Sequence, residues 1–230
     1  MKESTVIVVG GGVIGAACAH YLVEAGRKVT LLEKDLFGQA CSLRNCGYVC
    51  PSHALPLTEP GAIGMALRSM FKSNSPFSVK FRLDLRFALW LLGFARRCNE
   101  KDMLKGGKAI HPLLRSSMKL WRELMEKDQL PCEWKDKGLL YAYASQDKFD
   151  GYATTDRLLS EHFGESATRY DGESLIDLEP ALKPGLAGGW HYEGDAHLRS
   201  DLLMASWKKN LESKGVEIHE NCLFTGLLEN

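Results

Sequence analysis

The chain has 230 residues, of which 45% are hydrophobic, and its 29 lysines and arginines equal its 29 aspartates and glutamates. This neutral balance offers no electrostatic case for a nucleic acid partner, while the length is sufficient to bury a real hydrophobic core. The seven cysteines form no paired framework, no charged-then-apolar leader opens the chain, and no apolar run is long enough to span a bilayer, so we expect a cytoplasmic protein.

The first predicted elements are a strand, a glycine turn and a helix. Residues Thr5–Val9 are apolar without alternation, which predicts a parallel strand buried on both faces. Gly10, Gly12 and Gly15 follow with the spacing G-x-G-x-x-G, and a helix is predicted over Val13–Ala25. In this motif the glycines permit a tight turn, close approach of a pyrophosphate and helix packing on the strand. The helix N-terminus then binds the phosphates through free N–H groups.

The second predicted strand covers Val29–Leu32 and is followed directly by Glu33. The motif expects an acidic residue at this position, where a carboxylate accepts hydrogen bonds from a ribose 2′-hydroxyl and repels a 2′-phosphate. A buried strand with an ordinary turn is the alternative interpretation. Together the glycines and Glu33 predict a site for the ADP part of a dinucleotide, which is shared by NAD and FAD.

Residues 34–62 have no helical or strand period and contain several glycines and prolines, which predicts a long ordered loop. Within it, the stretch Ala40-Cys-Ser-Leu-Arg-Asn-Cys-Gly-Tyr-Val-Cys-Pro51 resembles the Ser-x-x-Asn-Ala-Gly stretch of the D-amino-acid dehydrogenase group. That group belongs to the D-amino-acid oxidase and glycine oxidase superfamily of FAD-dependent enzymes. Ser42, Asn45 and Gly47 match the pattern, and Cys46 replaces the usual alanine.

The resemblance implies an α/β fold with a Rossmann-like FAD-binding domain, of the FAD/NAD(P)-binding type, and part of an α+β substrate-binding domain. We expect residues 1–132 and 196–230 to form the FAD-binding domain, with a helical insertion at about 63–108. Residues 133–195 are expected to belong to the substrate-binding domain. Relatives continue for well over a hundred residues, which carry most groups for the substrate carboxylate. We therefore expect a fold that is incomplete at the C-terminus.

The resemblance also implies the cofactor site. In the superfamily the glycine motif binds the ADP half of FAD, and the loop after the second strand follows the ribityl chain and the flavin. No histidine occupies this loop where some relatives attach flavin, so we expect non-covalent FAD. The predicted cofactor-binding residues are Gly10, Gly12, Val13, Ile14, Gly15, Glu33, Lys34, Cys41, Ser42, Asn45, Cys46, Gly47, Tyr48 and, near the adenine, Phe224.

Two apolar helical segments are predicted in the insertion, at Met65–Phe71 and Leu83–Cys98. The second contains the most apolar run of the chain, Phe87–Ala95, which is flanked by Arg86, Arg96 and Arg97. We favour packing in a core for this helix. The alternative is an interfacial helix on the inner face of an anionic membrane, because dehydrogenases of the resembling group pass electrons to the respiratory chain.

The later helices and strands are predicted from hydrophobic periodicity and from residues typical of helix ends. Leu114, Met118, Trp121 and Met125 predict an amphipathic helix packed in the core. A further helix is expected with Ser200 as N-cap and an end at Lys214-Gly215. The other segments are a strand at Gly138–Ala144, a helical turn at Asp171–Pro180, a strand and turn at Gly188–Asp195, and two apolar stretches, Val216–His219 and Leu223–Leu228.

Candidate catalytic residues are few, because amine oxidation by a flavin needs little acid or base chemistry from the protein. Tyr48 and His53 are candidates for lining the active site, with a loop surface role as the alternative. For His191, Tyr192 and Arg199, near the domain junction, we favour structural hydrogen bonds over substrate contact. We expect no metal, because Cys41, Cys46 and Cys50 lack a C-x-x-C pair and a fourth ligand.

These features predict an FAD-dependent oxidoreductase that oxidises the C–N bond of an amino acid or secondary amine. It is most similar to a D-amino-acid dehydrogenase, which gives a 2-oxo acid and ammonia and passes electrons to the respiratory chain or to oxygen. Within the class, the alternative is a glycine, sarcosine or hydroxyproline oxidase or dehydrogenase. The alternatives from other classes are an NAD-dependent dehydrogenase and a truncated nucleotide-binding fragment without turnover.

Overall fold

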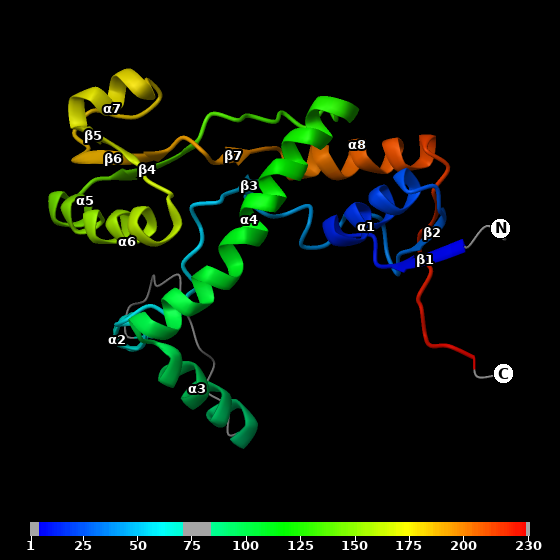
Figure 1. Ribbon diagram of the computed structural model, residues 1–230, viewed down its shortest axis with the longest axis horizontal. Coiled ribbons are helices and arrows are strands. Elements are labelled where there is room, and N and C mark those ends of the chain that lie inside the picture. Colours follow the sequence, from blue (N-terminus) through cyan, green and yellow to red (C-terminus); the bar gives the residue numbers. More distant parts are fainter. Residues whose placement is uncertain (1–4, 71–83, 229–230) are drawn as a thin grey trace. The chain divides into compact units, whose positions relative to one another are not determined.

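The computed structural model describes residues 5–70 and 84–228, and its elements are labelled in Figure 1. The chain divides into two compact units. The first unit consists of Met1–Val49, Lys119–Gly138 and Ala196–Asn230, and the second of Cys50–Met118 and Leu139–Asp195. The second unit thus includes residues that the sequence assigns to an insertion of the FAD-binding domain. The predicted domain boundaries at 132 and 196 stay a prediction.

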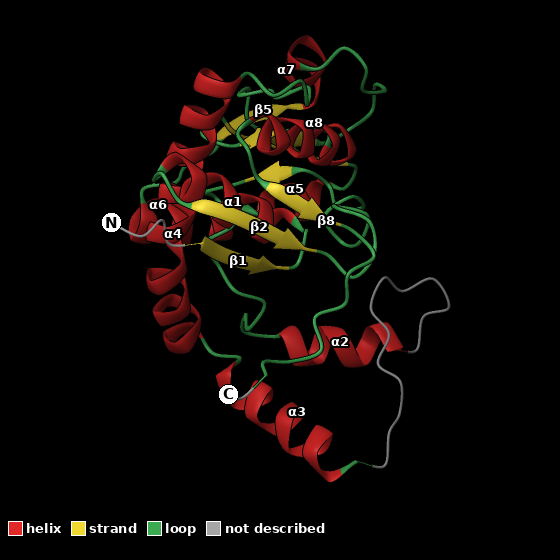
Figure 2. Ribbon diagram, turned by 90° about the vertical axis from the view of Figure 1, so that its right-hand side faces the viewer, coloured by secondary structure: helices red, strands yellow, loops and turns green. Residues whose placement is uncertain are grey.

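The first unit is built on a parallel sheet with the strand order β1-β2-β8, whose strands lie side by side in Figure 2. Val8 is paired with Leu31, and Leu31 with Ile218. The predictions of the first strand, the first helix and the second strand are confirmed. The elements are β1 (Thr5–Val9), α1 (Val13–Glu24), β2 (Lys28–Leu32), β3 (Tyr48–Val49), β7 (Ala196–His197), α8 (Ser200–Ser213) and β8 (Glu217–His219), with the last residues of α4 (Glu100–Asp128).

The prediction that the first strand is buried on both faces is wrong. Residues of β1 alternate between exposed and partly buried, and Ile7 and Val9 are 61% and 55% exposed. Successive side chains of a strand point to opposite faces of the sheet, so the exposed residues Thr5, Ile7 and Val9 mark one face of β1. One side of the strand therefore has no covering element among the described residues.

The core of the first unit lies between the sheet, α1 and α8. Small buried residues, Ala16 and Ala19, let α1 approach β2 closely, and Gly26 follows its end with a φ of +74°. On α8, the predicted repeat of Leu203, Trp207 and Leu211 is confirmed as buried. The shared core is completed by Val29, Leu31, Phe37, Leu124, Leu130, Cys132, Leu198, Met204 and Val216.

The prediction of Ser200 as a helix cap is wrong. Helix α8 begins at Ser200 itself and its N-cap is Arg199. The Ser200 hydroxyl instead donates toward the carbonyl oxygens of Leu43 at 2.9 Å and Asn45 at 3.3 Å. Tertiary contact with the loop has therefore replaced the local cap. The predicted end is confirmed, with Lys214 as C-cap and Gly215 at a φ of +84°.

A buried histidine on α1 lies in a charged cluster with residues of α4 and of the end of α8. His20 is 3% exposed, and its Nε2 lies 3.7 Å from Asp128 Oδ2. Lys214 Nζ lies 2.7 Å from Asp128 Oδ1 and 2.6 Å from Glu24 Oε1. Burial, followed by the charge of Lys214, lowers the pKa of His20 below its ordinary value of 6.5. His20 is therefore held in its neutral form at neutral pH.

We expect the free energy of unfolding to fall as the pH drops below about 6.5, because the unfolded chain then binds a proton at His20 that the folded chain excludes. A His20→Gln variant should lose part of this fall. Urea unfolding between about pH 7.5 and pH 5 measures the effect. The exposed His162 provides the matched control, and His162→Gln is unfolded in urea over the same pH range. Identical pH profiles for His20→Gln and the unchanged protein would contradict this account.

The second unit contains an antiparallel sheet with the strand order β4-β6-β5. Phe149, Leu175 and Trp190 are buried around it, and the Trp190 indole donates to the Phe149 carbonyl at 3.0 Å. The predicted strands and helical turn of this region are confirmed. The elements are α2 (Ala62–Met70), α3 (Leu85–Arg97), the first residues of α4, β4 (Leu139–Tyr143), α5 (Gln146–Gly151), α6 (Ala153–Phe163), β5 (Thr168–Asp171), α7 (Gly172–Leu178) and β6 (Gly188–Tyr192).

Helix α4 contributes to both cores, and its predicted amphipathic face is confirmed. Leu114 packs against the cluster of Ala54, Leu159, Phe163 and Tyr192 in the second unit. Met118 is 3% exposed, whereas Trp121 and Met125 pack against the core of the first unit.

The prediction of core packing for the arginine-flanked helix is wrong. None of the described residues of α3 is buried. Its helical character is confirmed over Leu85–Arg97, and that of the segment before it over Ala62–Met70. The predicted ends at Phe71 and Leu83 lie outside the described residues. No helix in the described part of the chain combines the length and apolarity needed to cross a membrane.

Candidate cofactor-binding site

The glycine turn between β1 and α1 is as tight as its G-x-G-x-x-G spacing predicts. Gly10 has a φ of +105° and its N–H donates to the Leu32 carbonyl at 2.8 Å. A Cβ added to Gly15 would lie 1.8 Å from the Gly10 carbonyl oxygen, which is far inside any allowed contact. The first turn of the helix therefore rests directly on the backbone of the glycine turn, and only glycine permits this.

The N-terminus of α1 is suited to bind an anion. Gly12 is the N-cap, no side chain caps it, and the first turn holds no acidic residue. No described residue accepts a hydrogen bond from the N–H groups of Ile14 or Gly15. The N–H of Val13 donates to Ser42 Oγ at 2.9 Å, so the serine hydroxyl keeps its own hydrogen for a further acceptor. Free donors and the helix dipole thus meet at one point.

Glu33 joins the end of β2 to the glycine turn. Its Oε2 accepts the Gly11 N–H at 2.7 Å, and its Oε1 accepts the Asp35 N–H at 2.9 Å. Its backbone N–H donates to the His219 carbonyl at the end of β8. Each carboxylate oxygen has a second lone pair, so Glu33 can still accept from ribose hydroxyls. The hydrogen bond to Gly11 is a second role, which the sequence did not predict.

The loop that resembles Ser-x-x-Asn-Ala-Gly is held in shape by the residues that match this pattern. Asn45 Oδ1 accepts the Gly47 N–H at 2.8 Å, while Asn45 Nδ2 donates to the carbonyls of Cys41 and Ser42 at 3.3 and 3.0 Å. Gly47 has a φ of +67°, and a Cβ there would lie 1.9 Å from the Leu198 carbonyl oxygen. The conformation of this loop therefore requires the side chain of Asn45 and the absence of a side chain at Gly47.

An open hollow in the surface adjoins this loop. It is lined by Gln39, Ala40, Cys41, Arg44 and Asn45. Gln39, Ala40 and Arg44 were not among the predicted residues, and Arg44 occupies a variable position of the stretch. The positive charge of Arg44 is the signal in the sequence that this hollow is suited to an anionic group.

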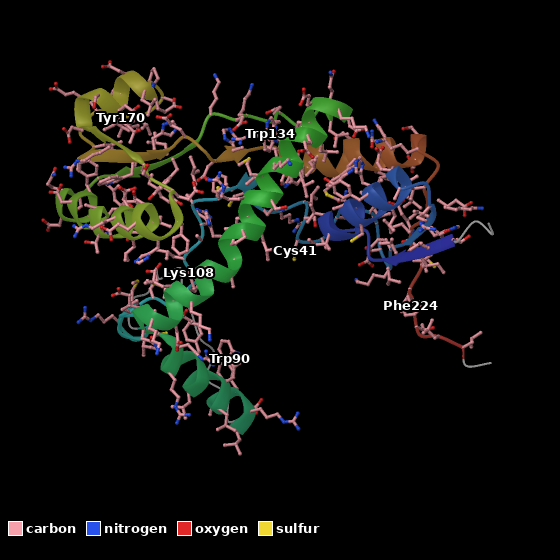
Figure 3. The ribbon with its side chains drawn as sticks, viewed as in Figure 1. Cys41, Trp90, Lys108, Trp134, Tyr170 and Phe224 are labelled. Carbon is pink, nitrogen blue, oxygen red and sulfur yellow. The ribbon has the colours of Figure 1, made fainter. Side chains whose placement is uncertain are left out.

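The other predicted cofactor residues are exposed in the first unit. Cys41 and Cys46 are free thiols, and Tyr48 on β3 is 53% exposed. Lys34 pairs with the neighbouring Asp35, which raises the pKa of the lysine. Phe224 lies on the segment after β8 and is 44% exposed (Figure 3). The roles predicted for these residues stay predictions.

His53, the other catalytic candidate, belongs to the second unit, where it contacts the Tyr141 hydroxyl. Beside it in the chain, Ser52 donates from its N–H and its hydroxyl to Asp195 at 3.1 and 2.5 Å. Asp195 is 1% exposed, and burial raises the pKa of its carboxyl. Ser52 and Asp195 were missed, because no pattern in the sequence links residues so far apart.

Tyr192 and Arg199, two of the residues predicted to make structural hydrogen bonds, have such partners in the structure. The Tyr192 hydroxyl lies 3.3 Å from both the Tyr152 hydroxyl and Asp156 Oδ1. Burial raises the pKa of Tyr152 to about 12. In the first unit, Arg199 makes an ion pair with Asp201 at 2.6 Å.

Together these residues fit a dinucleotide with two phosphates. The backbone at Gly12 is open, because an added Cβ would lie within 4 Å of Ser42 Oγ alone, at 3.1 Å. Gly12 is also the N-cap of α1, so the first N–H groups of the helix lie next to this space. Glu33 lies beside the turn with acceptors for a ribose. All of these groups belong to the first unit.

Comparison with known proteins agrees with this geometry. The family model described as DAO, FAD dependent oxidoreductase, matches residues 5–230. The D-amino acid dehydrogenase of Methylobacterium radiotolerans is 30% identical over 208 residues, which cover 87% of this chain and 49% of that relative. The chain thus spans about half the length of the curated relatives it matches.

Solved structures share the fold. The glycine oxidase from Bacillus cereus matches with a TM-score of 0.59 and 21% identity, over 100% of this chain and 49% of that one. The L-amino acid deaminase from Proteus vulgaris matches with a TM-score of 0.65 and 16% identity, over 100% of this chain and 42% of that one. The FAD-binding fold predicted from the sequence is confirmed. With a family model that covers nearly all its residues, the chain belongs to the DAO family of FAD-dependent oxidoreductases.

Proposed function

We propose that the protein oxidises the C–N bond of an amino acid or secondary amine, as a D-amino-acid dehydrogenase that forms a 2-oxo acid and ammonia. The observation that carries the proposal is the assembly, in one unit, of the glycine turn, Glu33 and the Ser42 loop in a chain of this family. The relatives named D-amino acid dehydrogenase, at up to 30% identity, support this choice of substrate class.

In the proposed reaction the amine loses a hydride from its α-carbon and a proton from its nitrogen. The resulting imine adds water and releases ammonia, while two electrons reach an acceptor, which is the respiratory chain or oxygen. When bound, FAD would supply the acceptor for the hydride and its two electrons. The residues of this chain would hold the cofactor: the α1 N-terminus and Ser42 at the phosphates, and Glu33 at the ribose.

The protein's own contribution is therefore orientation and exclusion of water rather than proton transfer. Ser42 is held by Val13, and the backbone of its loop is held by Asn45 and Gly47. A rigid loop of this kind would keep the cofactor in one orientation toward the substrate. Tyr48 and His53 stay the proposed residues for the substrate side.

A dye-reduction screen of the complete gene product tests the proposal. D- and L-amino acids, glycine, sarcosine and hydroxyprolines are offered with an artificial electron acceptor, and dye reduction is followed by absorbance. We expect D-amino acids to give the fastest reduction, and the purified protein to show the yellow absorbance of FAD. Faster reduction with sarcosine, glycine or hydroxyproline would favour the alternative substrates, and NAD-dependent turnover without flavin would refute the proposal.

The 230-residue chain by itself is expected to bind FAD weakly and to show no detectable oxidation of D-alanine. The relatives are about twice as long as this chain, and the family resemblance implies that most of their groups for the substrate carboxylate lie in their second halves. Robust D-alanine oxidation by residues 1–230 alone would show that these residues form a complete active site.

A further inference from the structure

A buried carboxylate in the second unit holds one residue with both of its oxygens. Asp195 is 1% exposed and follows β6 in a turn, where its N–H donates to the Tyr192 carbonyl at 3.2 Å. Its Oδ1 accepts the Ser52 N–H at 3.1 Å, and its Oδ2 accepts the Ser52 hydroxyl at 2.5 Å. Hydrogen bonds to a charged acceptor are among the strong ones, so this pair fixes both the backbone and the side chain of Ser52.

The turn that contains Ser52 presents one side chain to solvent. Its residues Pro51, Ser52 and Ala54 are buried, whereas His53 is exposed. Ala54 packs in the hydrophobic cluster of the second unit with residues of α6. The turn is therefore anchored at Ser52 by Asp195 and at Ala54 by the core. Between these two anchors, the backbone of His53 is held in one place.

The ring of His53 is held as well, by Tyr141 on β4. The Nε2 atom of His53 contacts the Tyr141 hydroxyl. The Tyr141 ring stacks on Tyr152 and meets Tyr192 edge-on, with centroid separations of 5.6 and 6.0 Å. Burial is the main cause that raises the pKa of Tyr141, so its hydroxyl keeps its hydrogen at neutral pH. Among the described residues, only His53 Nε2 accepts this hydrogen.

This hydrogen bond determines which nitrogen of His53 is free. Neutral histidine carries one ring hydrogen, and it is on Nδ1 when Nε2 accepts from the Tyr141 hydroxyl. No hydrogen bond joins Nδ1 to another described residue. An exposed N–H in a fixed orientation is suited to an anionic oxygen. A carboxylate is the anionic group that amino acids, sarcosine and hydroxyproline share.

We infer that Asp195 and Tyr141 are positioning residues, which hold His53 so that its Nδ1–H binds the substrate carboxylate. Asp195 acts through the Ser52 turn, and Tyr141 acts through its hydroxyl on Nε2. All four residues belong to the second unit. A donor that is already in place loses little conformational freedom on binding, so the expected effect is on KM rather than on kcat. The inference rests on the proposed function for the substrate, whereas the placement of His53 is measurable without turnover.

Chemical modification of His53 in the cofactor-free gene product tests this placement. Diethylpyrocarbonate acylates neutral histidine, and mass spectrometry of the His53 peptide gives the rate. Tyr141→Phe should raise the rate about fivefold, because Nε2 loses its hydrogen-bond donor. Asp195→Ala should raise it similarly, whereas Asp195→Asn keeps an acceptor for the Ser52 N–H and should leave it unchanged. Tyr143→Phe is the matched control, because no described residue bonds the hydroxyl of this tyrosine on the same strand.

Kinetics of the FAD-loaded gene product test the role in binding, with D-alanine or whichever screened compound is oxidised fastest. Tyr141→Phe should raise KM about fivefold while kcat changes by about twofold or less, and Asp195→Asn should restore the KM that Asp195→Ala loses. His53→Ala should raise KM roughly tenfold. Adding Tyr141→Phe to His53→Ala should raise KM no further, because the hydroxyl has lost its target.

Equal modification rates in Tyr141→Phe and the unchanged protein would overturn the inference and leave the proposed function intact. So would additive effects on KM in the double variant, which indicate a purely structural role for Tyr141, or an unchanged KM in His53→Ala. If no screened compound is oxidised, the proposed function fails and the carboxylate role of His53 fails with it. The expected modification rates would in that case still show that Tyr141 and Asp195 position the ring.

Discussion

A Gly15→Ala variant is expected to lose FAD affinity by roughly tenfold or more, since overpacking at such a contact costs about 1–3 kcal/mol. The added Cβ would lie 1.8 Å from the Gly10 carbonyl oxygen, so the helix must move away from the turn. This movement displaces the N–H groups of Ile14 and Gly15, which we propose bind the phosphates, and the Val13 N–H that holds Ser42. The free energy of unfolding of the cofactor-free protein should also fall.

The measurements are an FAD titration of the cofactor-free gene product, followed by flavin fluorescence, and urea unfolding of the same sample. Gly64→Ala on α2 is the control: its added Cβ meets nothing within 4 Å, so it should leave FAD affinity unchanged and should not lower the free energy of unfolding, because alanine is favoured over glycine inside a helix. Should Gly15→Ala keep the FAD affinity of the unchanged protein, the phosphates do not bind at this turn. A loss of stability with full FAD affinity would lead to the same conclusion.

A Glu33→Ala variant is expected to lower FAD affinity by roughly 10- to 100-fold, since a hydrogen bond to a charged group contributes about 1.5–3 kcal/mol. Two effects act together in this variant. The ribose loses its proposed acceptors, and the Gly11 N–H loses the carboxylate that holds it at 2.7 Å. The fold should persist, because the sheet register of β2 depends on backbone pairing with β1 and β8.

FAD affinity and thermal unfolding of Glu33→Ala separate the two effects. A Glu33→Gln variant keeps one oxygen for Gly11 but places an amide N–H₂ toward Asp35, whose N–H is also a donor. We expect it to bind FAD with intermediate affinity. Glu212→Ala is the control, because this exposed carboxylate on α8 lies outside the proposed site and its loss should not change FAD binding. Unchanged affinity in Glu33→Ala would show that the ribose is bound elsewhere.

The site was predictable from the sequence where its parts are close in the chain. The turn from β1 through Gly10, Gly12 and Gly15 into α1 follows from local sterics, and its bounds agree with the structure. The loop around Ser42 was found through a family resemblance rather than through periodicity. The structure adds the physical reason for Asn45, which folds the loop by accepting from Gly47.

Other features were not predictable because they depend on residues that are far apart in the chain. Ser200 carries a normal capping signal, but its hydroxyl donates toward the Leu43 carbonyl 157 residues away. Asp195 lacks any motif, and only folding brings it to Ser52. The apolar pattern of α3 was assigned to a core that the described residues do not provide. Periodicity reports that a surface is apolar, and it cannot report what covers that surface.

By itself, the sequence determined the nucleotide-binding end of this protein. A strand, three glycines, a helix and an acidic residue occur within the first 33 residues, and the conformations they allow depend mainly on neighbours in the chain. Only the tertiary structure decided the second role of Glu33 at Gly11, the edge position of β1 and the exposure of α3. These three features depend on which distant segments fold against each element, and that is a property of the assembled core rather than of any local pattern.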